Sequence, residues 1–309
     1  MKTFLPFLSL GALAAPLAAQ EPAPNESGNA IVVTAQRSGA PMWTIDTPTG
    51  TVILVGEIRA IPKSTPWEPA RLEEATRQAD RVILGAKPKV SPGDVLRLIF
   101  SGSKFTKLPD KTEASQYLTP DQWARLSALA AAHKEDYTRQ SFLLTSFEML
   151  RKQLRFNRDT ADEPSDVVRK AADKAKVPTT RAATLRGEDI IDNLADAPPQ
   201  AHIPCLTSAM DAVEAGPATV EKRAADWRRY DIPGVMANPL ENALGQCWPW
   251  ADDTLGSELR TIWVDNIAEA STASGTTLAV VPLRVLAESG GVLDQLALRG
   301  FDISGPEWK

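Results

Sequence analysis

The chain has 309 residues, of which 43% are hydrophobic and 24% are charged, and its formal net charge at pH 7 is −5. This length suffices for one large domain or two small ones with a buried core, and the composition is ordinary for a globular protein. The negative charge argues against a nucleic-acid-binding protein, because phosphate contacts need a dense basic surface. After the first twenty residues, no apolar run reaches membrane-spanning length.

Residues 1–19 have the pattern of a signal peptide. Lys2 precedes an apolar core at 4–13, and small residues at 14–19 suit cleavage after Ala19. The alternative is an uncleaved anchor, which the short, proline-interrupted core disfavours. No Cys lies near the cleavage site, so a lipoprotein is not expected. We therefore expect an exported protein, secreted or, in a Gram-negative bacterium, periplasmic.

Residues 20–40 are rich in Ala, Pro, Asn, Ser and Gly, and we expect a flexible lead-in to a domain at 41–309. Residues 42–45 and 51–55 have strand composition and flank a turn-forming segment, so they predict a β-hairpin. Gly56 is expected to end the second strand.

Beyond Gly56, a turn carries Glu57 and Arg59. Ligands of α/β proteins usually bind just past the carboxyl ends of strands, so this turn is the first candidate site.

A strand–helix–strand pattern follows. Thr65, Pro66 and Glu68 predict a capped helix start, and the helix should lead into a buried strand at 82–84. This spacing predicts a βαβ unit with a parallel strand pair. Gly85 and Lys87 come directly after the strand.

The middle of the chain, residues 119–231, is predicted to be a mostly helical insertion, after a short helix at 91–100. Thr119 and Gln122 form a capping box at its first helix. Apolar residues then recur at helical spacing, and 177–185 supply one strand.

Cys205 and Cys247 are the two cysteines of the chain. In an exported protein an even pair predicts a disulfide, and the alternative is a metal site with His202 and His133. Trp248 and the nearby Trp250 are expected to pack over the disulfide, and the alternative is a sugar-stacking platform.

The last part of the chain predicts a helix around Trp263, a buried strand at 278–281, a helix at 292–298 and a short strand at 301–303.

Two strand ends carry a family resemblance. The sequence Gly56-Glu57-Ile58-Arg59 resembles the first motif of the TraB/GumN (Tiki-like) family, in which a strand ends in Gly-x-x-His. Residues 67–84 resemble the helix and second strand of that family, which ends in Glu where this chain has Gly85.

Residues 279–301 resemble the second Gly-x-x-His motif and the helix after it, but the four motif positions read Val281-Pro282-Leu283-Arg284. The resemblance extends over most of 42–303. It implies an α/β fold with a central mixed sheet built from both chain ends and a mostly helical middle insertion.

The three positions that the resemblance would make catalytic or metal-binding are Arg59, Gly85 and Arg284. Guanidinium is permanently protonated and cannot coordinate a metal, and Lys87 adds positive charge. We therefore expect no metal, no cofactor and a catalytically degenerate protein with a binding, scaffold or regulatory role in envelope or polysaccharide processes.

Two interpretations of the arginines stay open. They could pair with Glu57, Glu288 or another carboxylate, or they could hold an anion. The candidate site residues are Gly56, Glu57, Arg59, Gly85, Lys87, Arg284 and Glu288. The partner is unknown, with a small anionic ligand or another envelope protein as candidates.

The competing hypothesis is a metal-dependent hydrolase that uses residues the motifs do not reveal. Its best local acids are Glu57, Glu288 and Asp294.

Overall fold

The computed structural model describes residues 38–94 and 102–309, which belong to one unit of the chain, Arg37–Lys309. The predicted signal peptide, most of the lead-in and residues 95–100 of the predicted short helix lie outside the described residues.

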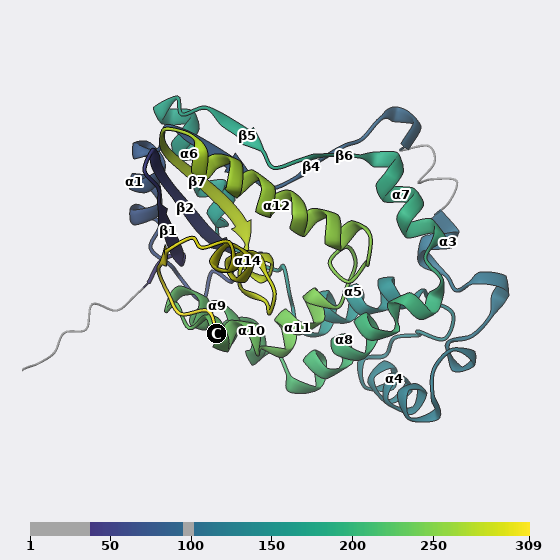
Figure 1. Ribbon diagram of the computed structural model, residues 1–309. Helices are drawn as coiled ribbons and strands as arrows, with labels where there is room; N and C mark the ends of the chain where they lie inside the picture. Colours follow the sequence, from purple (N-terminus) through teal and green to yellow (C-terminus); the bar gives the residue numbers. More distant parts are fainter. Residues whose placement is uncertain (1–37, 95–101) are drawn as a thin grey trace, which may run out of the picture. The chain divides into compact units, whose positions relative to one another are not determined.

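The centre of the fold is a six-stranded sheet with the strand order β5-β3-β7-β2-β1-β8 (Figure 1). Its strands are β1 (Met42–Asp46), β2 (Gly50–Glu57), β3 (Arg81–Leu84), β5 (Thr179–Arg181), β7 (Gly275–Pro282) and β8 (Ile303–Ser304). The strands β5, β3, β7 and β2 are parallel; β1 pairs antiparallel with β2, and the edge strand β8 pairs antiparallel with β1. The predicted mixed sheet from both chain ends is confirmed.

The register between β2 and β7 determines where the two family-like segments meet. It runs from Gly50 opposite Gly275 to Glu57 opposite Pro282, so both strands end at the same level. Arg59 and Arg284 each lie two residues beyond these ends. The prediction that the remote ends of the chain share one edge of the sheet is therefore confirmed.

Gly56 does not end its strand, contrary to expectation. Its N–H donates to the carbonyl of Pro41 (2.9 Å), and β2 continues through it to Glu57. A Cβ at this position would lie 2.8 Å from Leu283 Cδ1 and 2.9 Å from the Trp43 ring. Glycine is needed here for close packing, not for a turn.

Helices cover both faces of the sheet. The sheet-packing helices are α1 (Ala70–Gln78), α6 (Pro164–Ala175), α12 (Leu255–Thr272), α13 (Leu283–Ala287) and α14 (Val292–Leu298). The connections from β2 to β3 and from β3 back to β7 run in opposite directions along the sheet. Because such crossovers are right-handed, α1 and α12 lie on opposite faces (Figure 1).

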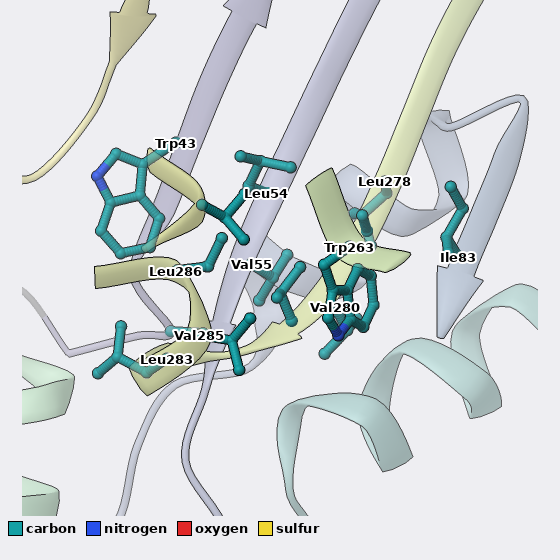
Figure 2. Close-up of a cluster of buried hydrophobic side chains, with 14 of the residues drawn as sticks. Trp43, Leu54, Val55, Ile83, Trp263, Leu278, Val280, Leu283, Val285 and Leu286 are labelled. Atoms are coloured by element: carbon teal, nitrogen blue, oxygen red, sulfur yellow. The ribbon is translucent and has the colours of Figure 1, made fainter. Parts of the chain in front are cut away.

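Figure 2 shows the core between α12, α13 and the central strands. Trp43, Leu54, Trp263 and Val280 are each at most 2% exposed there. Burial of such large apolar side chains supplies most of the driving force that holds the strand ends in place.

Two expectations for the βαβ unit are wrong. The strands β2 and β3 are parallel but not neighbours, since β7 pairs between them. The helix begins at Ala70 and not after Thr65, because the N–H of Glu68 donates to the carbonyl of Ser38 and holds this segment against the lead-in.

The middle of the chain is mostly helical, as predicted, but the helical part extends beyond residues 119–231 on both sides. Besides α6, its elements are α3 (Gly102–Thr106), η1 (Pro109–Lys111), η2 (Ala114–Gln116), α4 (Pro120–His133), α5 (Phe142–Gln153), α7 (Gly187–Asp196), η3 (Pro199–His202), α8 (Ile203–Ala215), α9 (Ala218–Arg228), α10 (Ile232–Met236) and α11 (Pro239–Gly245). The capping box of Thr119 and Gln122 is confirmed. The single strand predicted at 177–185 is instead two strands, β5 and β6 (Thr184–Arg186), and β6 pairs with β4 (Lys87–Lys89).

Cys205 and Cys247 form the predicted disulfide, which links α8 to the segment that follows α11. Trp248 packs against it, whereas Trp250 packs against the sheet core, so only Trp248 follows the expectation. Among the described residues, no helix combines the length and apolar character that crossing a membrane requires.

Candidate functional site

Arg284, in the first turn of α13, faces a carboxylate that the sequence did not identify. Its Nε donates to Glu241 Oε1 (3.2 Å) and its Nη2 donates to the backbone carbonyl of Glu241 (2.7 Å). Glu241 lies on α11, and its side chain is 6% exposed. The guanidinium of Arg284 therefore pairs with Glu241 and not with the carboxylate of Glu57 or Glu288.

A second buried arginine completes an ion network of Arg223, Glu241 and Arg284. Nε of Arg223 donates to Glu241 Oε2 (2.6 Å), and its Nη1 donates to the carbonyl of Arg59 (2.9 Å). Arg223 lies on α9 and is 4% exposed. The network thus joins the loop after β2 to the helix after β7.

The electrostatics of the network depend on Glu241. Burial raises the pKa of this carboxyl, but the two guanidiniums offset that effect and the net pKa is lowered. Glu241 is therefore ionised, and the network holds two cations and one anion.

A close approach by the backbone of α11 fixes the position of Arg284. A Cβ on Gly245 would lie 2.5 Å from Nε of Arg284 and 2.7 Å from its Cδ. Only glycine leaves room for the guanidinium to reach Glu241 along this path.

Glu57 is the carboxylate closest to the end of β2. It is half-buried and accepts the Ser165 N–H (2.9 Å) in the first turn of α6. Burial raises the pKa of Glu57, and the nearby carboxylate of Glu163 adds to the rise against the opposing hydrogen bonds from Ser165. Perturbed carboxyls of this kind are frequent at functional sites.

The loop after Glu57 is held in a strained conformation. Ala60 has a φ of 57°, which an L-residue with a Cβ rarely adopts, and its N–H donates to Glu163 Oε1 (2.8 Å). Arg59 precedes it with an exposed side chain. Within the described residues, the Arg59 guanidinium has no hydrogen bond or ion pair, although its charge lowers the pKa of Glu57.

The other predicted site residues are spread around this edge. Gly85 follows β3, and a Cβ there would meet nothing within 4 Å. Lys87 is exposed on β4. Glu288 pairs with Arg260 of α12 (2.5 Å), and Asp294 accepts from Gly290 N (3.0 Å) near the start of α14.

The donor set at this edge does not suit a divalent cation. The positions that the resemblance assigns to ligands hold two guanidiniums and one residue without a side chain, and none of these has an electron pair to donate. Over residues 38–94 and 102–309, no three His, Cys, Asp or Glu side chains are grouped so that they could hold a metal ion.

Sequence reasoning missed Arg223 and Glu241. Arg223 follows Val220 by three residues and precedes Trp227 by four, on a helix face that is otherwise buried. Glu241 is likewise flanked by buried Leu240 and Ala243. A charge on an apolar helix face could have indicated a buried ion pair, although not its partner.

In a comparison with protein families, the model of the TraB/PrgY/gumN family matches residues 41–305. Searches of curated proteins and of solved structures gave no significant match. The match covers most of the chain and includes both strand ends at which the ion network and Glu57 lie. The chain therefore belongs to the TraB/PrgY/gumN family.

Proposed function

We propose that this family member is a catalytically degenerate, exported protein that acts by binding, as a scaffold or regulator in envelope processes. The observation that carries the proposal is Arg284, which lies two residues beyond β7 with its guanidinium bound to buried Glu241. A cation fixed in this way repels a metal ion and leaves no ligand in its place.

Export is supported by two features. The pattern of residues 1–19 suits a signal peptide, and Cys205 and Cys247 are paired. Disulfides persist in oxidising compartments such as the periplasm or the extracellular medium.

Arg59 is a cation at this edge that stays available to a small anionic ligand, because the described residues give its guanidinium no hydrogen-bonded partner. Arg284, in contrast, is occupied by Glu241. The affinity for inorganic phosphate, measured by titration, should therefore fall in Arg59→Ala. Lys63→Ala is the control and should change the affinity by no more than about twofold, because the exposed ammonium of Lys63 already pairs with Asp159.

A second candidate is a hydrolase in which Glu57 acts as a general acid or base, which its burial and raised pKa favour. One experiment distinguishes the binding protein from the hydrolase. The purified protein is analysed for metal content and assayed for peptide and ester hydrolysis with and without Mn²⁺ or Co²⁺, beside Glu57→Gln.

The binding proposal expects no stoichiometric metal and no turnover above the Glu57→Gln background. Metal-dependent turnover that Glu57→Gln abolishes would overturn it and establish the hydrolase. Turnover that is independent of metal but lost in Glu57→Gln would also overturn it.

A further inference from the structure

The helical middle of the chain contains a hollow of about 730 Å³ that the sheet-edge residues do not line. Its walls come from α3, η1, the start of α5, the end of α7 and η3, and α3 contacts both α5 and α7. We call it the insertion pocket. Its volume falls in the range of sites for small organic ligands.

The inner surface of the insertion pocket is apolar. Phe105, Leu108, Phe142, Leu143 and Leu194 contribute to it, and Leu108, Phe142 and Leu143 are at most 9% exposed. Leu143 and Leu194 also pack against the Cys205–Cys247 disulfide, which braces this wall. Such a surface favours a hydrocarbon chain or ring over water.

The mouth of the pocket is cationic. Lys107, Lys111 and Arg139 line it with exposed side chains, against the single carboxylate of Asp110 among the described lining residues. The hydrogen bonds and ion pairs within the described residues leave these three cations without a carboxylate partner. An unneutralised basic rim over an apolar interior is complementary to an anionic head on an apolar body.

The rim is also strained. Asp110 and Lys111 have φ values of 51° and 58°, so two consecutive residues with a Cβ adopt the left-handed conformation. Backbone strain of this kind is concentrated at ligand clamps, where the surrounding structure enforces it.

His202 adds a polar group to the inner part of the pocket. Burial lowers the pKa of His202, against a smaller opposing effect of Asp252, so the imidazole is neutral at pH 7. A neutral imidazole can donate or accept one hydrogen bond without adding charge.

From this arrangement we propose that the insertion pocket binds an amphipathic organic anion, a single acyl chain or apolar ring with one carboxylate head. The carboxylate lies among Lys107, Lys111 and Arg139, and the apolar body enters toward Leu143 and Leu194. This assignment does not rest on the proposed function, because the pocket and the sheet edge have no residue in common.

The test is calorimetric titration of the full chain with octanoate, decanoate and dodecanoate. Each added methylene should tighten binding about fourfold, from about 0.8 kcal/mol per buried CH₂. Dodecyl maltoside has the same tail with a neutral head and should bind at least about tenfold more weakly than dodecanoate, and dodecyltrimethylammonium should not compete.

Matched variants locate the site. Lys107→Gln combined with Lys111→Gln should weaken dodecanoate binding at least about tenfold. Lys134→Gln is the control, since Lys134 is also exposed with a φ of 58° but lies at the end of α4. It should leave binding within about twofold.

A blocking variant tests the interior. Ala195→Trp on α7 places an indole in the hollow and should abolish binding, whereas Ala195→Ser should not. Circular dichroism and urea midpoints check that the variants fold. Equal affinity for anionic and neutral heads, no gain with chain length, or unchanged binding in the double variant and Ala195→Trp would each overturn the assignment.

Discussion

Replacing Glu241 by Gln tests whether the ion network at the sheet edge is structural. The substitution keeps the shape of the side chain and removes its charge. The side chains of Arg223, Glu241 and Arg284 are 5%, 6% and 15% exposed. Glu241→Gln therefore leaves two guanidiniums that are largely buried from solvent without a counter-charge.

The expected cost follows from that geometry. Removing one partner of a buried ion pair lowers the free energy of unfolding by about 3–5 kcal/mol. Arg284→Met should cost less, about 1–3 kcal/mol, because Arg223 and Glu241 remain as a neutral pair and Glu241 loses only two hydrogen bonds. The asymmetry between the two variants is the signature of a network with an excess cation.

The pH dependence has a defined sign. The net pKa of Glu241 in the folded state lies below its ordinary value of 4.5, because the two guanidiniums outweigh burial. A lowered folded pKa stabilises the protein above the unfolded pKa, and that stabilisation is lost as pH falls through the folded value. The difference between wild type and Glu241→Gln should therefore be full at pH 7 and shrink below pH 4.5.

Urea unfolding at pH 7 and at acidic pH measures both effects, with the m-value as a check on two-state behaviour. Glu73→Gln is the control, since Glu73 forms an exposed pair with Arg77 (3.7 Å) and should cost at most about 0.5 kcal/mol. The reasoning is refuted if Arg284→Met costs as much as Glu241→Gln, or if acid leaves their difference unchanged.

Three further predictions follow from the same contacts. Glu57→Gln should raise the unfolding free energy at pH 7, because burial raises the folded pKa of Glu57 and so penalises its ionised form once the pH rises through that pKa. The gain should disappear below pH 4, where Glu57 is protonated, and urea unfolding of wild type and variant at the two pH values measures both effects. Gly245→Ala should destabilise the wild type by about 1–2 kcal/mol by displacing Arg284, yet be neutral or stabilising beside Arg284→Ala, and additive costs in this double-mutant cycle would contradict the steric account. Cys205→Ala with Cys247→Ala should lower the unfolding free energy by about 4 kcal/mol, from a closed loop of 42 residues, and a loss below about 1 kcal/mol would show that the disulfide contributes little.

Local sequence signals determined most of the secondary structure. The hairpin of β1 and β2, the capped start of α4 and the strand β7 follow from turn residues, caps and apolar runs that act over a few positions. The disulfide was predictable from the two cysteines together with the signal-peptide pattern of residues 1–19. The presence of arginine, which cannot coordinate a metal, at positions 59 and 284 could also be seen from the sequence, because residue chemistry does not depend on the fold.

The tertiary structure alone decided which charges meet. The sequence holds many carboxylates, and nothing local distinguishes Glu241, 43 residues before Arg284, from Glu57 or Glu288. The insertion of β7 between β2 and β3 was equally hidden, because strand order depends on which crossover packs best. Hydrogen bonding and apolar periodicity act between near neighbours in the chain, whereas ion pairing and burial depend on distances between remote segments, and only the folded chain sets those distances.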